Sequence, residues 1–130
     1  MTAINLSGIQ SISVPTDIKV GDEVTVLHDS KNPYQSPNEP ALIVKHEGRP
    51  IGFIPVLSTI DRYIAQAREE NNLKQYEYHS SRKAAASAVR YALENDMFRN
   101  HIIPIGKICR LQVDEDSGKV LSVSVMFNYM

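Results

Sequence analysis

The chain has 130 residues, of which 42% are hydrophobic and 22% charged, and 14 Lys and Arg residues nearly balance 15 Asp and Glu residues. This length and composition predict a single folded domain over residues 1–130, and they exclude wholesale disorder and low-complexity architectures. The weak net charge of −1 argues against a protein that wraps DNA nonspecifically, so any contact with nucleic acid should be small and local.

The first half of the chain predicts four strands, at residues 4–14, 23–28, 41–46 and 51–54. The first of them alternates apolar and polar side chains with the period of two that is typical of a half-buried strand. Between the second and third strands, residues 29–40 contain three prolines. Each proline ring fixes its own φ angle, so we expect this segment to form a stiff, ordered loop.

Two helices are predicted next. In the first, apolar residues recur at helical spacing, namely Leu57, Ile60, Ile64 and Ala67. Ser58 is the residue expected to cap its N-terminus. The second helix is predicted from about Ser81 to Met97, with an apolar side formed by Ala85, Ala88, Val89, Ala92 and Leu93.

A hairpin is predicted to close the chain, over about residues 102–129. Its first strand places five apolar residues on one face: Ile103, Ile105, Cys109, Leu111 and Val113. Its second strand does the same with Leu121, Val123, Val125, Phe127 and Tyr129. About six strands and two helices without a βαβ rhythm predict a mainly β, α+β fold, in which an antiparallel sheet or small barrel is flanked by the helices.

No motif predicts catalysis, a metal or a cofactor. The chain has no nucleophile elbow and no glycine-rich phosphate loop, and its four histidines show no metal-ligand spacing. Cys109 is its only cysteine, which excludes an internal disulfide, and it is expected to be a buried, inert thiol. The sequence therefore predicts a protein that is not an enzyme.

No membrane location is predicted either. The N-terminal residues lack a basic start and an apolar run, and no stretch approaches the length needed to span a bilayer. We therefore expect a cytoplasmic protein. Its oligomeric state is open, since the helix at 81–97 could cover the sheet or form a dimer face.

One run of motifs resembles the HIRAN domain. Val24-Thr25-Val26-Leu27 is followed in order by Asn32-Pro33-Tyr34, by Ala41-Leu42-Ile43-Val44 and by Gly48-Arg49-Pro50-Ile51-Gly52-Phe53-Ile54-Pro55. The resemblance covers residues 4–70 and is closest to a stand-alone member of the family. It implies a β-barrel similar in shape to an oligonucleotide-binding fold, with a role in DNA repair and a helicase or nuclease acting in trans.

The resemblance also implies a site that captures the 3′ end of single-stranded DNA. Its residues would be Asn32, Tyr34, Gln35 and Phe53, with Lys31 and Arg49 steering the phosphates. The ring of Tyr34 could stack on a base, and the Gln35 amide could accept a hydrogen bond from a 3′-hydroxyl.

This chain departs from the family pattern at several positions. Gln35 stands where the family has Asp, the segment after it is longer, and no Arg-Tyr pair lies on the first strand, where Ser11 to Ser13 are found. A second hypothesis therefore keeps the same barrel but makes it a protein-interaction or regulatory module that binds no DNA.

Overall fold

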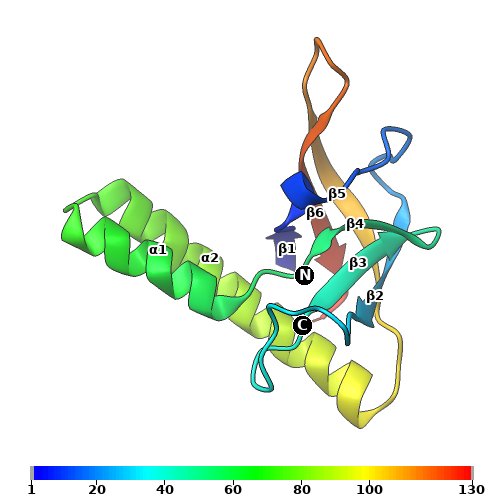
Figure 1. Ribbon diagram of the computed structural model, residues 1–130, viewed down its shortest axis with the longest axis horizontal. Helices are drawn as coiled ribbons and strands as arrows, with labels where there is room; N and C mark the ends of the chain where they lie inside the picture. Colours follow the sequence, from blue (N-terminus) through cyan, green and yellow to red (C-terminus); the bar gives the residue numbers. More distant parts are fainter. Residues whose placement is uncertain (1, 130) are drawn as a thin grey trace.

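A computed structural model, which describes residues 2–129, shows an α+β fold in which two helices flank a six-stranded antiparallel sheet (Figure 1). The strands are β1 (Thr2–Asn5), β2 (Glu23–His28), β3 (Leu42–His46), β4 (Arg49–Phe53), β5 (Ile105–Val113) and β6 (Val120–Phe127). Their order across the sheet is β1-β6-β5-β2-β3-β4. The α+β class and the antiparallel pairing agree with the sequence prediction.

The closed barrel that the sequence suggested is not confirmed, because the sheet is open, with β1 and β4 at its edges. Within residues 2–129 these edges approach each other through one isolated bridge. In that bridge, Ser7 and Phe53 exchange two backbone hydrogen bonds of 2.9 Å. The sheet is thus curved enough to bring its two ends together at one point.

The core combines side chains of the sheet with side chains of the two helices. Alternate residues point into it, as the period of two requires: Val24 and Val26 of β2 are buried, whereas Thr25 between them is only partly covered. The largest fully buried side chains are Phe127, Leu42, Ile51, Ile54, Ile60, Leu93 and Ile108. Full burial of one such side chain stabilises the fold by about 1.5–3 kcal/mol.

The first predicted strand is too long. Strand β1 ends at Asn5, and Gly8 adopts a left-handed φ of 70° that starts a 3-10 turn at Ile9–Ser11. A Cβ atom on Gly8 would lie 3.0 Å from the ring of Phe53. Only glycine tolerates both this backbone angle and this contact, so the extended chain stops here.

The predicted inner face of the first closing strand is wrong for Ile103, Ile105 and Val113, which are exposed, whereas Leu111 packs against the core as predicted. Ile103 and Ile105 are 57% and 59% exposed, whereas Ile108 is buried. The register of β5 against β6 shifts after Ile108, and the half-buried Cys109 occupies this irregularity. Such a bulge moves every later side chain to the other face, which simple alternation does not reveal.

The helices are α1 (Leu57–Glu69) and α2 (Leu73–Glu94), and α2 continues into a π turn, η2 (Asn95–Arg99). They pack side by side as a hairpin that extends away from the sheet (Figure 1). Helix α2 begins earlier than predicted, because the Asn72 side chain accepts a hydrogen bond from the backbone N–H of Gln75. No helix in residues 2–129 has the length and apolarity that crossing a membrane requires.

Candidate functional site

The loop between β2 and β3 has the ordered conformation that its prolines predict. The Asn32 side chain accepts a hydrogen bond from the backbone N–H of Tyr34 at 2.9 Å, and its amide donates one to the Asp29 carboxylate at 3.3 Å. The first of these bonds is an Asx turn, which suits the intervening Pro33. As a result the Tyr34 side chain extends into solvent and is 95% exposed.

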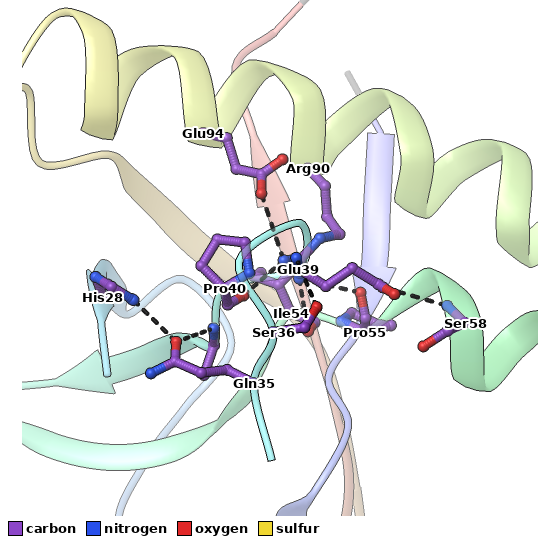
Figure 2. A network of polar contacts seen from close by, with 11 residues as sticks. His28, Gln35, Ser36, Glu39, Pro40, Ile54, Pro55, Ser58, Arg90 and Glu94 are labelled. Carbon is purple, nitrogen blue, oxygen red and sulfur yellow. Dashed lines mark hydrogen bonds and ion pairs between the residues drawn. The ribbon is translucent and has the colours of Figure 1, made fainter. Parts of the chain in front are cut away.

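Gln35 stabilises the same loop through side-chain hydrogen bonds. Its Oε1 atom accepts hydrogen bonds from the backbone N–H of Ala41 at 3.0 Å and from Nε2 of His28 at 2.9 Å (Figure 2). Its Nε2 atom donates to the carbonyl oxygen of Ser30 at 2.8 Å. Both lone pairs of Oε1 are therefore occupied, and one amide N–H remains for a ligand. Gln35 cannot accept a hydrogen bond from a 3′-hydroxyl in this conformation.

A cavity of about 450 Å³ adjoins this loop, within the usual size range of ligand pockets. Its lining residues are His28, Gln35, Ser36, Pro37, Pro40 and Phe98. The ring of Phe98, from η2, meets the His28 ring edge to face at 5.2 Å. None of the lining residues is Asp, Glu, Lys or Arg, so the cavity suits an uncharged group with an apolar face.

The remaining residues that the sequence proposed lie in two different places. Lys31 is exposed on the loop itself, close in sequence to Asn32 and Tyr34. Phe53 packs its ring against Gly8 and does not line the cavity. Of the six predicted residues only Gln35 lines the cavity; Lys31, Asn32 and Tyr34 lie on the same loop outside its lining, and Phe53 lies elsewhere.

Arg49 is the first residue of β4, at the opposite end of this strand from Phe53 and next to the turn between β3 and β4. It forms an ion pair of 3.1 Å with Asp17, and this hydrogen-bonded guanidinium lowers the pKa of the Asp17 carboxyl. Arg49 is not part of the cavity beside Tyr34.

Arg90 on α2 is a residue of this site that the sequence analysis missed. It is only 2% exposed and donates hydrogen bonds to the carbonyl oxygens of Pro40 at 2.7 Å and of Ile54 and Pro55 at 3.3 Å each (Figure 2). Burial lowers its pKa, and the Glu94 carboxylate 3.6 Å away opposes that effect.

A signal for Arg90 was present in the sequence. The buried residues of α2 are Ala86, Val89, Arg90 and Leu93, which is the spacing of one helix face. A guanidinium at an apolar position of this pattern indicates a buried charge that needs partners. Phe98 had no comparable signal, because it lies in the short π turn after the regular helix.

Glu39 fixes the other side of the loop to α1. Its Oε2 atom accepts a hydrogen bond from the backbone N–H of Ser58 at 3.2 Å (Figure 2). The expectation that Ser58 caps this helix with its own side chain is wrong: Val56 occupies the N-cap position, and a carboxylate from the loop serves the free N–H group.

A metal is not supported at this site. Among the described residues, no three His, Cys, Asp or Glu side chains cluster as metal ligands do. Among the residues of the cavity wall, His28 uses its Nε2 atom in the hydrogen bond to Gln35, which leaves its Nδ1 atom for a ligand.

Comparison of the chain with known proteins found no relative. No family model matches the chain, and no curated protein or solved structure is similar to it. Membership of the HIRAN family therefore stays a prediction from the motifs, and the function has to be argued from the loop, the cavity and their contacts.

Proposed function

We propose that the protein binds the 3′ end of single-stranded DNA at the cavity beside the β2–β3 loop. The observation that carries this proposal is the position of Tyr34. Its ring is 95% exposed on a loop that Asn32 and Gln35 hold rigid, and the following residue, Gln35, lines a cavity of about 450 Å³. An exposed aromatic ring on an ordered loop is available for stacking, and every nucleic-acid base presents a flat face for it.

The cavity suits a terminal nucleoside with a free hydroxyl. Pro37, Pro40 and Phe98 provide apolar walls for a base, while the Ser36 hydroxyl and the remaining N–H of Gln35 can hydrogen-bond a sugar hydroxyl. No cation lines the cavity. A terminal phosphate there would lose its water without gaining a charged partner, which is unfavourable.

The rest of the strand would lie outside the cavity. The next base would stack on Tyr34, a contact worth about 1–3 kcal/mol. Lys31 is exposed on the same loop and can pair with a backbone phosphate. The protein itself would supply binding only, so any reaction on the DNA would come from a helicase or nuclease in trans.

The site is tested by fluorescence anisotropy with a short oligothymidylate labelled at its 5′ end. Tyr34→Ala should weaken binding by about tenfold, the effect of losing one base stack. Tyr91→Ala is the matched control, because this tyrosine is 75% exposed but lies on α2. Equal affinities for wild type and Tyr34→Ala would overturn the proposed site.

A protein-interaction module is the second candidate, and one observation favours it. Ile102, Ile103 and Ile105 are each more than half exposed, in the segment that follows Phe98 of the cavity wall. Neighbouring exposed apolar side chains are typical of protein-binding surfaces. Absence of oligonucleotide binding by the wild type, even at low salt, would favour this candidate over DNA binding.

A further inference from the structure

A second and larger hollow, of about 610 Å³, lies between the first half of α2 and the strands β1, β6 and β5. It is separate from the cavity beside Tyr34, with which it shares no lining residue. We call it the α2 groove. Its polar residues come from two sides, the helix and the sheet, and each side contributes one arginine.

On the sheet side, Asn5, Ser124 and Arg110 form a row across three neighbouring strands. Asn5 pairs with Ser124 in the β1–β6 register, and Ser124 pairs with Arg110 in the β6–β5 register. Directly paired residues in antiparallel strands point to the same face of a sheet. All three line the groove, so this face of the sheet carries an amide, a hydroxyl and a guanidinium together.

The bulge in β5 explains how Arg110 reaches this face. In a regular strand, residues 108 and 110 would point to the same side. Here Ile108 is buried in the core, and the register shifts between Ile108 and Arg110. The extra residue, Cys109, turns Arg110 outward to the groove. The irregularity therefore places a cation opposite α2, whereas regular pairing would have directed the Arg110 side chain into the core.

On the helix side, Tyr78, Ser81 and Arg82 line the groove. The Nε atom of Arg82 is shielded from solvent and has no hydrogen-bond partner among the described residues. A shielded N–H group without an acceptor is unfavourable by about the strength of a lost hydrogen bond. Arg82 lines the groove, so a ligand oxygen that reached its guanidinium from there would give this group an acceptor.

The charge of the groove is not compensated. None of its lining residues is Asp or Glu, and within residues 2–129 neither Arg82 nor Arg110 forms an ion pair. By contrast, Arg49, Lys83 and Arg90 each have a carboxylate within 4 Å. The groove thus combines two free guanidinium groups with hydroxyl and amide donors.

We propose that the α2 groove binds a phosphate-bearing ligand. Guanidinium groups match phosphate oxygens with paired, charge-assisted hydrogen bonds, and Ser124, Ser81 and Asn5 supply the additional donors that such oxygens accept. The phosphate can belong to a small soluble compound or to the backbone of a nucleic-acid strand. The proposal does not depend on the function proposed for the cavity beside Tyr34.

The test is an NMR titration of the arginine Nε–H signals with sodium pyrophosphate, compared with sodium chloride at equal ionic strength. We expect a saturable shift of the Arg82 and Arg110 signals with pyrophosphate and none for Arg62, an exposed arginine on α1. Arg110→Gln, an exposed position, should fold normally and bind pyrophosphate at least about tenfold more weakly. Arg82→Lys, which keeps the charge but loses the paired donors, should also weaken binding.

A shift no larger than that with chloride, or unchanged affinity in both arginine variants, would overturn the proposal. A circular oligothymidylate, which has no ends, then identifies the source of the phosphate. If it displaces pyrophosphate, the groove binds strand backbone; if it does not, the groove binds a small phosphate compound. Because pyrophosphate contains no base or sugar, failure of this titration is distinguishable from failure of 3′-end binding.

Discussion

The guanidinium of Arg90 donates a hydrogen bond of 2.7 Å to the carbonyl oxygen of Pro40, although the two residues are 50 positions apart in the chain. Pro40 lines the cavity beside Tyr34, and Arg90 lies on the buried face of α2. The same guanidinium also holds the carbonyl groups that follow β4. The helix, the edge strand and the candidate binding loop are therefore fixed to one another by a single side chain.

Arg90→Met should be strongly destabilising. Methionine fills much of the same space but leaves the carbonyl oxygens of Pro40, Ile54 and Pro55 without their donor, at about 1–3 kcal/mol for each buried group left unsatisfied. We expect a loss of about 3 kcal/mol or more in the free energy of unfolding, from three such groups at about 1 kcal/mol or more each, measured by urea denaturation. Arg62→Met on the exposed face of α1 is the control and should change stability little. Equal stability of both variants would show that the Arg90 contacts are not needed.

The N-terminus of α1 offers a comparison between two neighbouring polar side chains. Glu39→Ala should lower stability by about 1 kcal/mol, because its carboxylate accepts the hydrogen bond of the Ser58 N–H. Ser58→Ala should have almost no effect, since no hydroxyl of this helix serves as its cap. Thermal unfolding of the two variants measures the difference. The opposite order would mean that the serine caps its own helix after all.

Gln35→Ala should loosen the loop that carries Tyr34. The substitution leaves the backbone N–H of Ala41 without an acceptor, and Ala41 is buried. We expect a loss of about 1–3 kcal/mol and faster hydrogen exchange at the Ala41 amide. Gln10→Ala, at an exposed position, is the matched control. An unchanged exchange rate at Ala41 would contradict the bracing role of Gln35.

His79 should make stability fall in mildly acidic solution. Burial lowers the pKa of its imidazole below the ordinary value of 6.5, and the nearby Arg82 adds to this effect. The folded state therefore binds the proton less tightly than the unfolded chain does. The contribution of His79 to the free energy of unfolding is fully present above about pH 6.5 and decreases as the pH falls through the lowered pKa.

Urea unfolding between about pH 7.5 and pH 5 measures this dependence. His79→Gln should reduce the loss of stability across that range, whereas Gln10→Ala, at an exposed position without a titratable side chain, should leave it unchanged. If His79→Gln keeps the full dependence of the wild type, another group is responsible.

Much of the fold follows from the sequence because alternation and helical spacing report local burial directly. The second, third and fourth strands and the closing hairpin are found close to their predicted places. The start of α2 was missed because Leu73 is 66% exposed, so no apolar stripe marks the first turns of this helix. The bulge after Ile108 was missed because a register shift depends on the partner strand.

The candidate site was only partly predictable. The local motif grouped Asn32, Tyr34 and Gln35, and residues so close in sequence on an ordered loop lie close in space, but only Gln35 lines the cavity. It could not show that Gln35 uses its amide oxygen within the loop, because the partners His28 and Ala41 are set by the pairing of β2 with β3. Phe98 lines the cavity because the turn η2, which is distant in sequence, lies against the β2–β3 loop, and the local motif does not indicate this contact.

Capture of a strand end is the central claim, and competition between DNA ligands tests it most directly. A labelled oligothymidylate bound to the wild-type protein is challenged with three unlabelled strands: one ending in a free 3′-hydroxyl, one ending in a 3′-phosphate, and a circular strand without ends. We expect the strand with the free hydroxyl to compete best, the phosphorylated strand less well, and the circle least. Equal competition by all three strands would contradict end capture.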